Sequence, residues 1–257
     1  MGDPRGTRNV PLLVAAGAVI VAAIVAIAVG FNRASTVGVT RSSPTAAPAS
    51  ASASPTPASS PIPYADCSTA TFGAPLQPLS PPADLHTYSA PVGMSIDQTK
   101  LYQATITTPK GKIVLCLQPD LAPATVNVFV TLARNHFYDG IPFHRVVANF
   151  VIQGGDPGCI GNVPAAPASP TGACGSGGPG FKFNDEPVRQ KYVAGCLAMA
   201  NSGTNTNGSQ FFICSADDTS QLQNLYNLFG KVYSGMDVVT QIQQGDVMQS
   251  ITVAEQQ

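Results

Sequence analysis

The stretch from Phe143 to Asp156 places one permanent cation, Arg145, among apolar side chains. An isolated guanidinium cannot be buried without a partner, so its position between Phe143 and Phe150 calls for a physical reason. We interpret the stretch as the wall of a shaped binding site, in which Arg145 is a preorganised hydrogen-bond donor with apolar surroundings.

A second stretch, from Met199 to Ile213, offers complementary chemistry. Its first part is rich in amide side chains and glycine, and its last part contains Phe211 and Phe212. Glycine and asparagine favour tight bends, whereas aromatic residues favour strands. The stretch therefore predicts hydrogen-bonding groups beside a hydrophobic platform, as in a ligand pocket.

The two stretches also carry recognisable motifs. Residues Phe143 to Asp156 read Phe-His-Arg, four further residues, Phe, two further residues and Gln-Gly-Gly-Asp. Residues Met199 to Phe212 begin with Met-Ala-Asn and end with Asn-Gly-Ser-Gln-Phe-Phe, and Phe-Gly-Lys-Val follows at Phe229 to Val232. In these segments the chain resembles the cyclophilin family of peptidyl-prolyl cis/trans isomerases, in a membrane-anchored bacterial form. Three motifs in the family's order are a more specific signal than any single motif.

The resemblance implies a role for each matching residue. It implies that Arg145, Phe150 and Gln153 are catalytic, with Arg145 donating a hydrogen bond to the nitrogen of a prolyl peptide bond. The implied ligands are proline-containing polypeptides. The implied substrate-binding residues are Val151, Ala200, Asn201, Gln210, Phe212, Leu222 and Tyr226.

Rotation about an X-Pro bond must overcome a resonance barrier of about 18–20 kcal/mol. A hydrogen bond to the prolyl nitrogen withdraws its lone pair from resonance, and a site that holds the twisted amide most tightly lowers the barrier. No proton or group is transferred, so we expect neither a metal nor a cofactor. His144 is accordingly interpreted as a structural, hydrogen-bonded residue and not as a base.

Two positions depart from the best-known relatives, and other functions stay open. Tyr226 stands where many cyclophilins have a histidine, and the tryptophan that many carry near Leu222 is absent. One alternative is a proline-peptide-binding chaperone module with weak turnover. The other is a purely structural envelope protein.

Composition excludes one class of function. The chain has 257 residues, of which only 11% are charged, and its net charge is -1. A nucleic-acid-binding surface is normally strongly basic, so we expect no nucleic-acid partner.

The N-terminal part reads as an anchor and a tether. Residues 10–31 are almost wholly apolar, long enough to cross a hydrocarbon core of about 30 Å, and they follow a short cytoplasmic N-terminus, residues 1–9. We interpret them as a single transmembrane helix. A cleaved signal peptide is the alternative, although its apolar core usually spans only about 7–15 residues. Residues 32–63, rich in Ser, Ala and Pro, form the predicted disordered linker.

Arginines on both sides of the apolar run leave its orientation undecided. The six cysteines, none of them in a Cys-x-x-Cys pair, favour an oxidising compartment. We therefore predict a monomeric, single-pass protein of the cell membrane with its catalytic domain outside the cytoplasm.

The remaining chain divides into a lead-in segment, residues 64–98, and a domain, residues 99–257. β-rich runs at 102–108 and 112–117 predict a hairpin, and residues 250–253 predict a closing strand. Residues 123–134 and 235–242 predict helices. Short strands separated by Gly and Pro are typical of an antiparallel barrel. The resemblance implies a mainly β fold, an eight-stranded antiparallel barrel capped by two helices.

One loop, residues 157–180, is longer than in bacterial relatives, and Cys159 and Cys174 frame its extra part. A disulfide there would close a loop of about 15 residues and stabilise the fold by about 3 kcal/mol. Metal binding is the alternative, but no histidine or acidic pair lies nearby in the sequence. The pairing of the other four cysteines stays open.

Overall fold

The computed structural model describes residues 60–166 and 172–257. The predicted transmembrane helix, residues 10–31, and most of the predicted linker lie outside the described residues. Within the described part, no helix combines the length and the apolar character needed to cross a bilayer.

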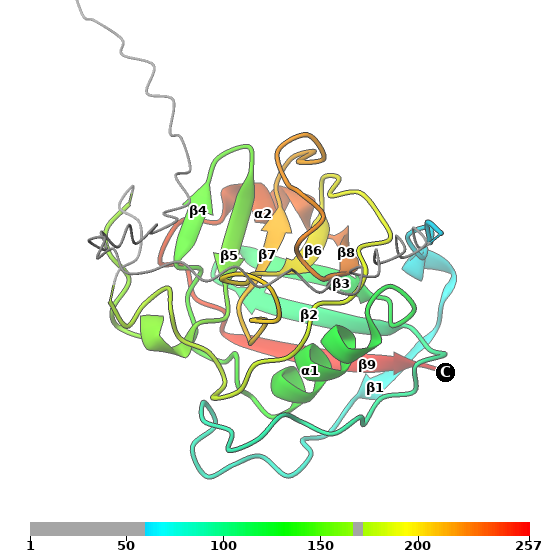
Figure 1. Cartoon of the computed structure of the whole chain (residues 1–257), viewed down its shortest axis with the longest axis horizontal. Helices are drawn as coiled ribbons and strands as arrows, with labels where there is room; N and C mark the ends of the chain where they lie inside the picture. Colours follow the sequence, from blue (N-terminus) through cyan, green and yellow to red (C-terminus); the bar gives the residue numbers. More distant parts are fainter. Residues whose placement is uncertain (1–59, 167–171) are drawn as a thin grey trace, which may run out of the picture. The chain divides into compact units, whose positions relative to one another are not determined.

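One antiparallel sheet dominates the described residues (Figure 1). Its nine strands there pair in the order β1-β9-β2-β3-β8-β6-β7-β5-β4. The strands are β1 Phe72–Pro75, β2 Tyr102–Thr108, β3 Gly111–Leu117, β4 Arg145–Val147, β5 Val151–Gly154, β6 Cys196–Met199, β7 Phe211–Cys214, β8 Leu228–Ser234 and β9 Ser250–Gln256. The two motif stretches thus supply β4, β5, most of β7 and the last residue of β6, and these four strands are neighbours at one end of the sheet.

Strands β2 and β3 form the predicted hairpin, with Thr108 opposite Gly111 at the turn. Along β2, the side chains of Tyr102, Ala104 and Ile106 are fully buried, and those between them are partly exposed. Burial with a period of two is what a sheet with one buried face requires. Gly111 has a φ of +134°, a backbone conformation that other residues rarely adopt.

The sheet is not closed into the expected eight-stranded barrel, because its end strands β1 and β4 do not pair with each other. At one end the lead-in adds β1, which pairs with β9. At the other end, the chain just before β4 hydrogen-bonds to the chain just before β9, with an isolated bridge between Pro142 and Val247. In this bridge the N–H groups of Phe143 and Met248 donate to Asp246 O and Ile141 O, so Pro142, which has no N–H group, needs no donor of its own.

Helix α1, Pro123–Arg134, coincides with the first predicted helix and lies across one face of the sheet (Figure 1). Proline is preorganised for the first position of a helix. The backbone N–H groups of Ala124 and Thr125 donate to the carboxylate of Glu186 at 3.0 and 2.8 Å. A carboxylate at this end favours the helix, and Phe129 on the buried face packs into the core.

Helix α2, Met236–Gln241, is slightly shorter than the predicted helix over residues 235–242. Gly235 precedes it with a φ of +88°, and Ile242 leaves the helical conformation. Val239 and Ile242 are buried. The closing strand is longer than predicted, because β9 pairs with β2 along its length and also with β1.

The lead-in packs against the rest of the described chain. Its apolar side chains Leu76, Tyr88, Val92 and Ile96 contact the hydrophobic core. A disulfide between Cys67 and Cys116 joins it covalently to β3. The lead-in thus lies against the domain, whereas a domain boundary at residue 99 stays a prediction.

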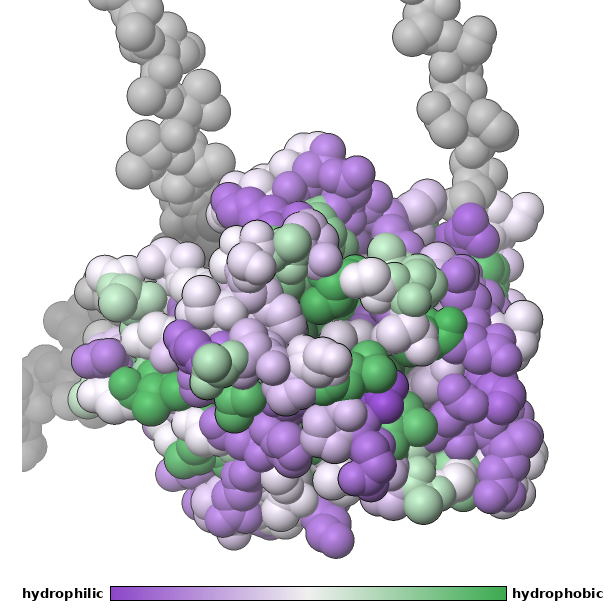
Figure 2. Space-filling view, turned by 90° about the horizontal axis from the view of Figure 1, so that it is seen from below, coloured by the Kyte–Doolittle hydropathy of each residue, from purple (hydrophilic) through white to green (hydrophobic). Residues whose placement is uncertain are grey.

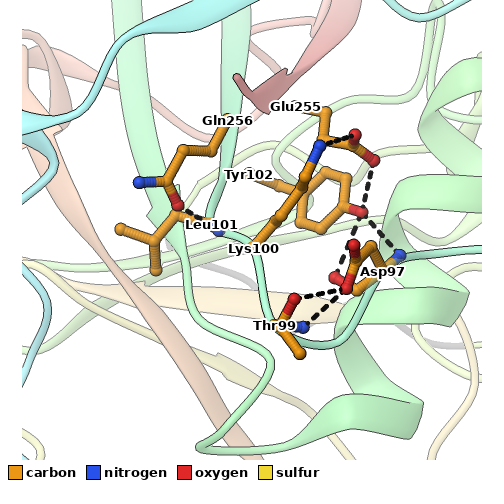
Figure 3. Close-up of polar contacts among 7 residues, drawn as sticks. All are labelled: Asp97, Thr99, Lys100, Leu101, Tyr102, Glu255 and Gln256. Carbon is orange, nitrogen blue, oxygen red and sulfur yellow. Dashed lines mark hydrogen bonds and ion pairs between the residues drawn. The ribbon is translucent and has the colours of Figure 1, made fainter.

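Polar contacts fix the end of the lead-in to the last strand (Figure 3). The hydroxyl of Tyr102 donates to Glu255 at 2.7 Å and accepts the backbone N–H of Asp97 at 2.8 Å. Lys100 forms an ion pair with Glu255 at 2.8 Å. Partly exposed ion pairs stabilise a fold by at most about 1 kcal/mol, so this cluster chiefly determines geometry.

Figure 2 shows the described residues from below the view of Figure 1, with small, separate hydrophobic areas between hydrophilic ones. Scattered exposed apolar side chains are normal on a protein surface. The exposed large hydrophobic residues in the described part are Leu79, Leu85, Met94, Val147, Ile160, Leu225 and Tyr233.

Candidate functional site

Three of the predicted site residues lie in one row across neighbouring strands. Arg145 of β4 is opposite Gln153 of β5, and Gln153 is opposite Phe212 of β7. Directly opposed residues of antiparallel strands point to the same face of the sheet. The register therefore places a guanidinium, an amide and an aromatic ring side by side.

Arg145 is half-buried and keeps donors available. Its Nη1 donates a long hydrogen bond to Gln153 Oε1 at 3.4 Å, and its Cζ lies 5.8 Å from the centroid of the Phe150 ring. Burial lowers the pKa of Arg145, although a guanidinium stays protonated at neutral pH. In the described chain no carboxylate forms an ion pair with it. The arginine can therefore bind a ligand without first breaking a strong contact.

Amide groups continue the row on one side. Gln153 Nε2 donates to Gln210 Oε1 at 3.0 Å, and the backbone N–H of Ala200 donates to the backbone oxygen of Gln210 at 2.9 Å. Asn201 uses its side-chain Nδ2 to donate to Leu225 O at 2.8 Å. The side chain of Asn201 thus fixes a loop, which leaves its backbone to contact a ligand, as the family resemblance implies.

A hydrophobic cup lies on the other side of the row. Val151 and Phe212 are buried in one apolar cluster, and Phe150, Leu222 and Tyr226 pack against it while staying partly exposed. The rings of Tyr226 and Phe212 meet edge to face, with centroids 5.5 Å apart. Such a half-open apolar surface can bind a small nonpolar ring.

The loop after β7 carries two of the cup residues. The hydroxyl of buried Tyr192 donates to Tyr226 O at 2.8 Å and accepts the Tyr226 N–H at 3.1 Å. Burial raises the pKa of Tyr192, so the hydroxyl stays neutral and can both donate and accept. The N–H of Leu222 donates to Asp218 O at 2.9 Å. These bonds hold the main chain from which both cup side chains project.

A cleft of about 640 Å³ adjoins the cup, and Ala200, which lines the cleft, packs against the same apolar cluster as the cup residues. Gln153, Asn201 and Gln210 also line the cleft, and the glycine-rich segment Gly175–Gly180 forms part of its wall. The predicted residues therefore fall into two groups. The cup residues, which do not line the cleft, are Phe150, Val151, Phe212, Leu222 and Tyr226.

His144 is only 1% exposed, and neither ring nitrogen has a hydrogen-bond partner among the described residues. The ring therefore lacks the expected hydrogen bond to the described residues at a strict distance and angle, whereas its structural role stays a prediction. The side chain of Gln210 lies near the ring, but hydrogen-bond geometry is not reached. Burial lowers the pKa of His144, so the ring is neutral at pH 7 and costs less to bury than a charged one.

The disulfide predicted between Cys159 and Cys174 is present. The other four cysteines pair as Cys67 with Cys116 and Cys196 with Cys214. In the described ranges, no three His, Cys, Asp or Glu side chains converge as metal ligands.

Sequence reasoning missed two parts of the site. Tyr192 belongs to no motif and carries no signal of its contact with Tyr226. The segment Gly175–Gly180 is interpreted from sequence only as part of a disulfide-framed loop. Its density of glycine was the available signal, because glycine allows a backbone to approach a ligand closely.

A family model described as "Cyclophilin type peptidyl-prolyl cis-trans isomerase/CLD" matches residues 103–256. The chain belongs to the cyclophilin family. It is 40% identical over 156 residues to a peptidyl-prolyl cis-trans isomerase of Helicobacter pylori, covering 59% of this chain and 86% of that protein. It is 40% identical over 145 residues to peptidyl-prolyl cis-trans isomerase B of Bacillus subtilis, covering 56% of this chain and 91% of that protein.

A solved cyclophilin structure agrees with this assignment. A cyclophilin type peptidyl-prolyl cis-trans isomerase of Cryptosporidium parvum matches with a TM-score of 0.50 and 28% identity, over 60% of this chain and 97% of that one. The cyclophilin match begins at residue 103 and so leaves out strand β1 and Cys67. The lead-in is therefore an addition to the part shared with the family.

Proposed function

We propose that this protein is a peptidyl-prolyl cis/trans isomerase that acts on proline-containing polypeptides. One observation carries the proposal: Arg145, without an acidic partner in the described residues, stands in register with Gln153 and Phe212 beside an apolar cup. The relatives named as isomerases support it.

The chemistry follows from the arrangement. A proline ring seated in the cup places its nitrogen within reach of the guanidinium, which donates a hydrogen bond to the lone pair as the amide twists. The lone pair then contributes less to amide resonance, so the barrier to rotation falls. Because the donor is fixed and half-buried before the substrate arrives, little reorganisation is needed in the transition state.

The test is the substitution Arg145→Ala. We expect kcat/KM for an Ala-Pro peptide in a protease-coupled assay to fall by about 10²–10³, the usual effect of removing one preorganised donor. Lys112→Ala removes an exposed positive charge of β3 and is the matched control, with activity near that of the unchanged protein. A folded Arg145→Ala variant with full activity would contradict the proposal.

The same assay separates the isomerase from a proline-peptide-binding chaperone with weak turnover. That alternative predicts peptide binding by the unchanged protein in a titration but hardly any acceleration of isomerisation. A structural envelope role predicts neither.

We further propose that the protein works as a monomer in a bacterial cell membrane, with the isomerase part outside the cytoplasm. The apolar run at residues 10–31 and the pairing of all six cysteines support this placement. Protease added to intact cells should digest the isomerase part, and its full protection would refute the placement.

A further inference from the structure

The carboxylate of Asp156 is completely buried just after β5, and it accepts four hydrogen bonds. The N–H of Gly158 donates to Oδ1 at 2.8 Å. Oδ2 accepts the N–H groups of Gly175 and Gly177 at 2.6 and 2.9 Å, and Gln210 Nε2 at 3.2 Å. No lysine or arginine of the described chain forms an ion pair with it. Backbone and amide donors alone compensate its burial.

This charge decides which way two glutamine side chains face. An ionised carboxylate only accepts hydrogen bonds, so Gln210 turns its NH₂ group to Asp156 and its oxygen to Gln153. Gln153 then donates its own NH₂ group at 3.0 Å and turns its oxygen to Arg145, at 3.4 Å. A reversed Gln153 would turn its NH₂ group to the guanidinium, and a reversed Gln210 would turn its NH₂ group to the NH₂ group of Gln153. Asp156 therefore sets the acceptor that holds the catalytic cation.

A loop segment reinforces the same orientation. The Gly177 carbonyl oxygen accepts Gln210 Nε2 at 2.9 Å, and that of Gly175 accepts it at 3.3 Å. Two carbonyl groups and one carboxylate thus all select the NH₂ end of the amide. The orientation of Gln210 depends on the loop remaining against Asp156.

The disulfide between Cys159 and Cys174 holds this loop in place. Cys159 ends a short 3-10 helix, Pro157–Cys159, that starts beside Asp156, and Cys174 immediately precedes the first donor residue of the loop. The fit is close, because a Cβ atom on Gly177 would overlap Asp156 Oδ1. The crosslink therefore joins the two segments that enclose the carboxylate.

We propose that Asp156 is a positioning residue for the isomerase site and that the Cys159–Cys174 disulfide supports it. The proposal rests on the proposed isomerase function. The relay from Asp156 through Gln210 and Gln153 fixes the guanidinium of Arg145, which acts on the twisted amide. Loss of this relay lowers the turnover of bound substrate more than it weakens substrate binding.

The first test is Asp156→Asn, which keeps the size of the side chain but removes the charge and replaces one acceptor oxygen with a donor. We expect kcat to fall roughly ten- to a hundredfold and KM to change by less than about threefold, as for a misplaced catalytic group. In NMR spectra, the side-chain NH₂ signals of Gln153 and the Nε–H signal of Arg145 should shift. A folded variant with unchanged kcat and unchanged signals would overturn the proposal.

The second test decides the matter if that variant does not fold. Cys159→Ala/Cys174→Ala removes the supporting disulfide, and Cys67→Ala/Cys116→Ala removes a disulfide with no bond to the relay. We expect the first pair to lower kcat about three- to tenfold and to shift the Gln153 signals, whereas the second does neither. Equal kcat values and unshifted signals in both would overturn the proposal.

The two proposals can fail independently, because the isomerase assay tests the function and the NMR signals test the relay. If the unchanged protein does not accelerate isomerisation, the proposed function is lost. The NMR signals of Gln153 and Arg145 then still show whether Asp156 and its disulfide orient the relay.

Discussion

At the scale of single residues, two ionisable side chains near the hydrophobic cup, Arg145 and Asp218, differ in burial and in hydrogen bonding. Arg145 is half-buried and has unused donors, so it can bind a ligand. Asp218 is fully buried under the cup loop, where Oδ1 accepts Gln221 Nε2 at 3.1 Å and Oδ2 has no partner among the described residues. Burial and the neighbouring Asp217 raise the pKa of Asp218 to about 6.

The raised pKa predicts a pH dependence of stability. An unfolded aspartate has a pKa of about 3.9, so between about pH 4 and 6 the folded chain binds a proton that the unfolded chain does not. The contribution of Asp218 is fully present below this window and is lost as pH rises through it. We expect Asp218→Asn to raise the free energy of unfolding at pH 7.5 by about 1 kcal/mol, with a smaller gain at pH 4.5. Denaturant unfolding at both pH values measures this, and an equal gain at both would contradict it.

At the scale of elements, two disulfides and the first residues of the lead-in lie on one face of the sheet. Cys116 of β3 is opposite Lys231 of β8, and Lys231 is opposite Cys196 of β6. The lead-in residue Tyr64 lies over this row, with its ring centroid 5.5 Å from Lys231 Nζ. The Cys67–Cys116 disulfide thus closes the lead-in over strands that are remote from it in sequence.

Loop length predicts how much each crosslink stabilises the fold. Cys67 and Cys116 are 49 residues apart and Cys159 and Cys174 are 15 apart, so the first closes the larger loop. On the chain-entropy model, Cys67→Ala/Cys116→Ala should cost about 4 kcal/mol and Cys159→Ala/Cys174→Ala about 3 kcal/mol. Denaturant unfolding of both variants gives the comparison. The reverse order would mean that loop closure does not determine how much each disulfide stabilises the fold.

At the scale of the whole molecule, the described chain is a cyclophilin part with a structured addition. The family match begins at residue 103, whereas the structure describes residues from 60 onward. The addition supplies an edge strand, a disulfide and apolar side chains in contact with the core.

We expect a chain beginning at Thr99 to be less stable than one beginning at Ser60 by at least about 5 kcal/mol, because it loses a disulfide and several buried apolar contacts. Its kcat/KM at low temperature should stay within a few-fold, since the row from Arg145 to Phe212 lies wholly outside the lead-in. Unfolding curves and peptide assays on both chains measure the two effects. Equal stability would show that the lead-in contributes nothing to the fold.

The local features of this protein can be predicted from short stretches of its sequence. The β2–β3 hairpin and helix α1 follow from periodicities of two and 3.6 residues and from a proline, all of which act over a few positions. The motif stretches supplied the candidate residues Arg145, Gln153 and Phe212, because each motif is continuous along the chain. The bond between Cys159 and Cys174 was suggested by their place around one loop.

The way these local elements pack together cannot be predicted from such stretches and is seen first in the folded chain. Gln153 reaches Gln210 because β5 pairs with β7, and no local pattern specifies that register. The same applies to the contact of Tyr192 with Tyr226, to the two remaining disulfides and to strand β1, which the lead-in adds to the sheet. Each depends on contacts between segments far apart in the chain, whose formation reflects burial over the whole sheet and not the preference of any single segment.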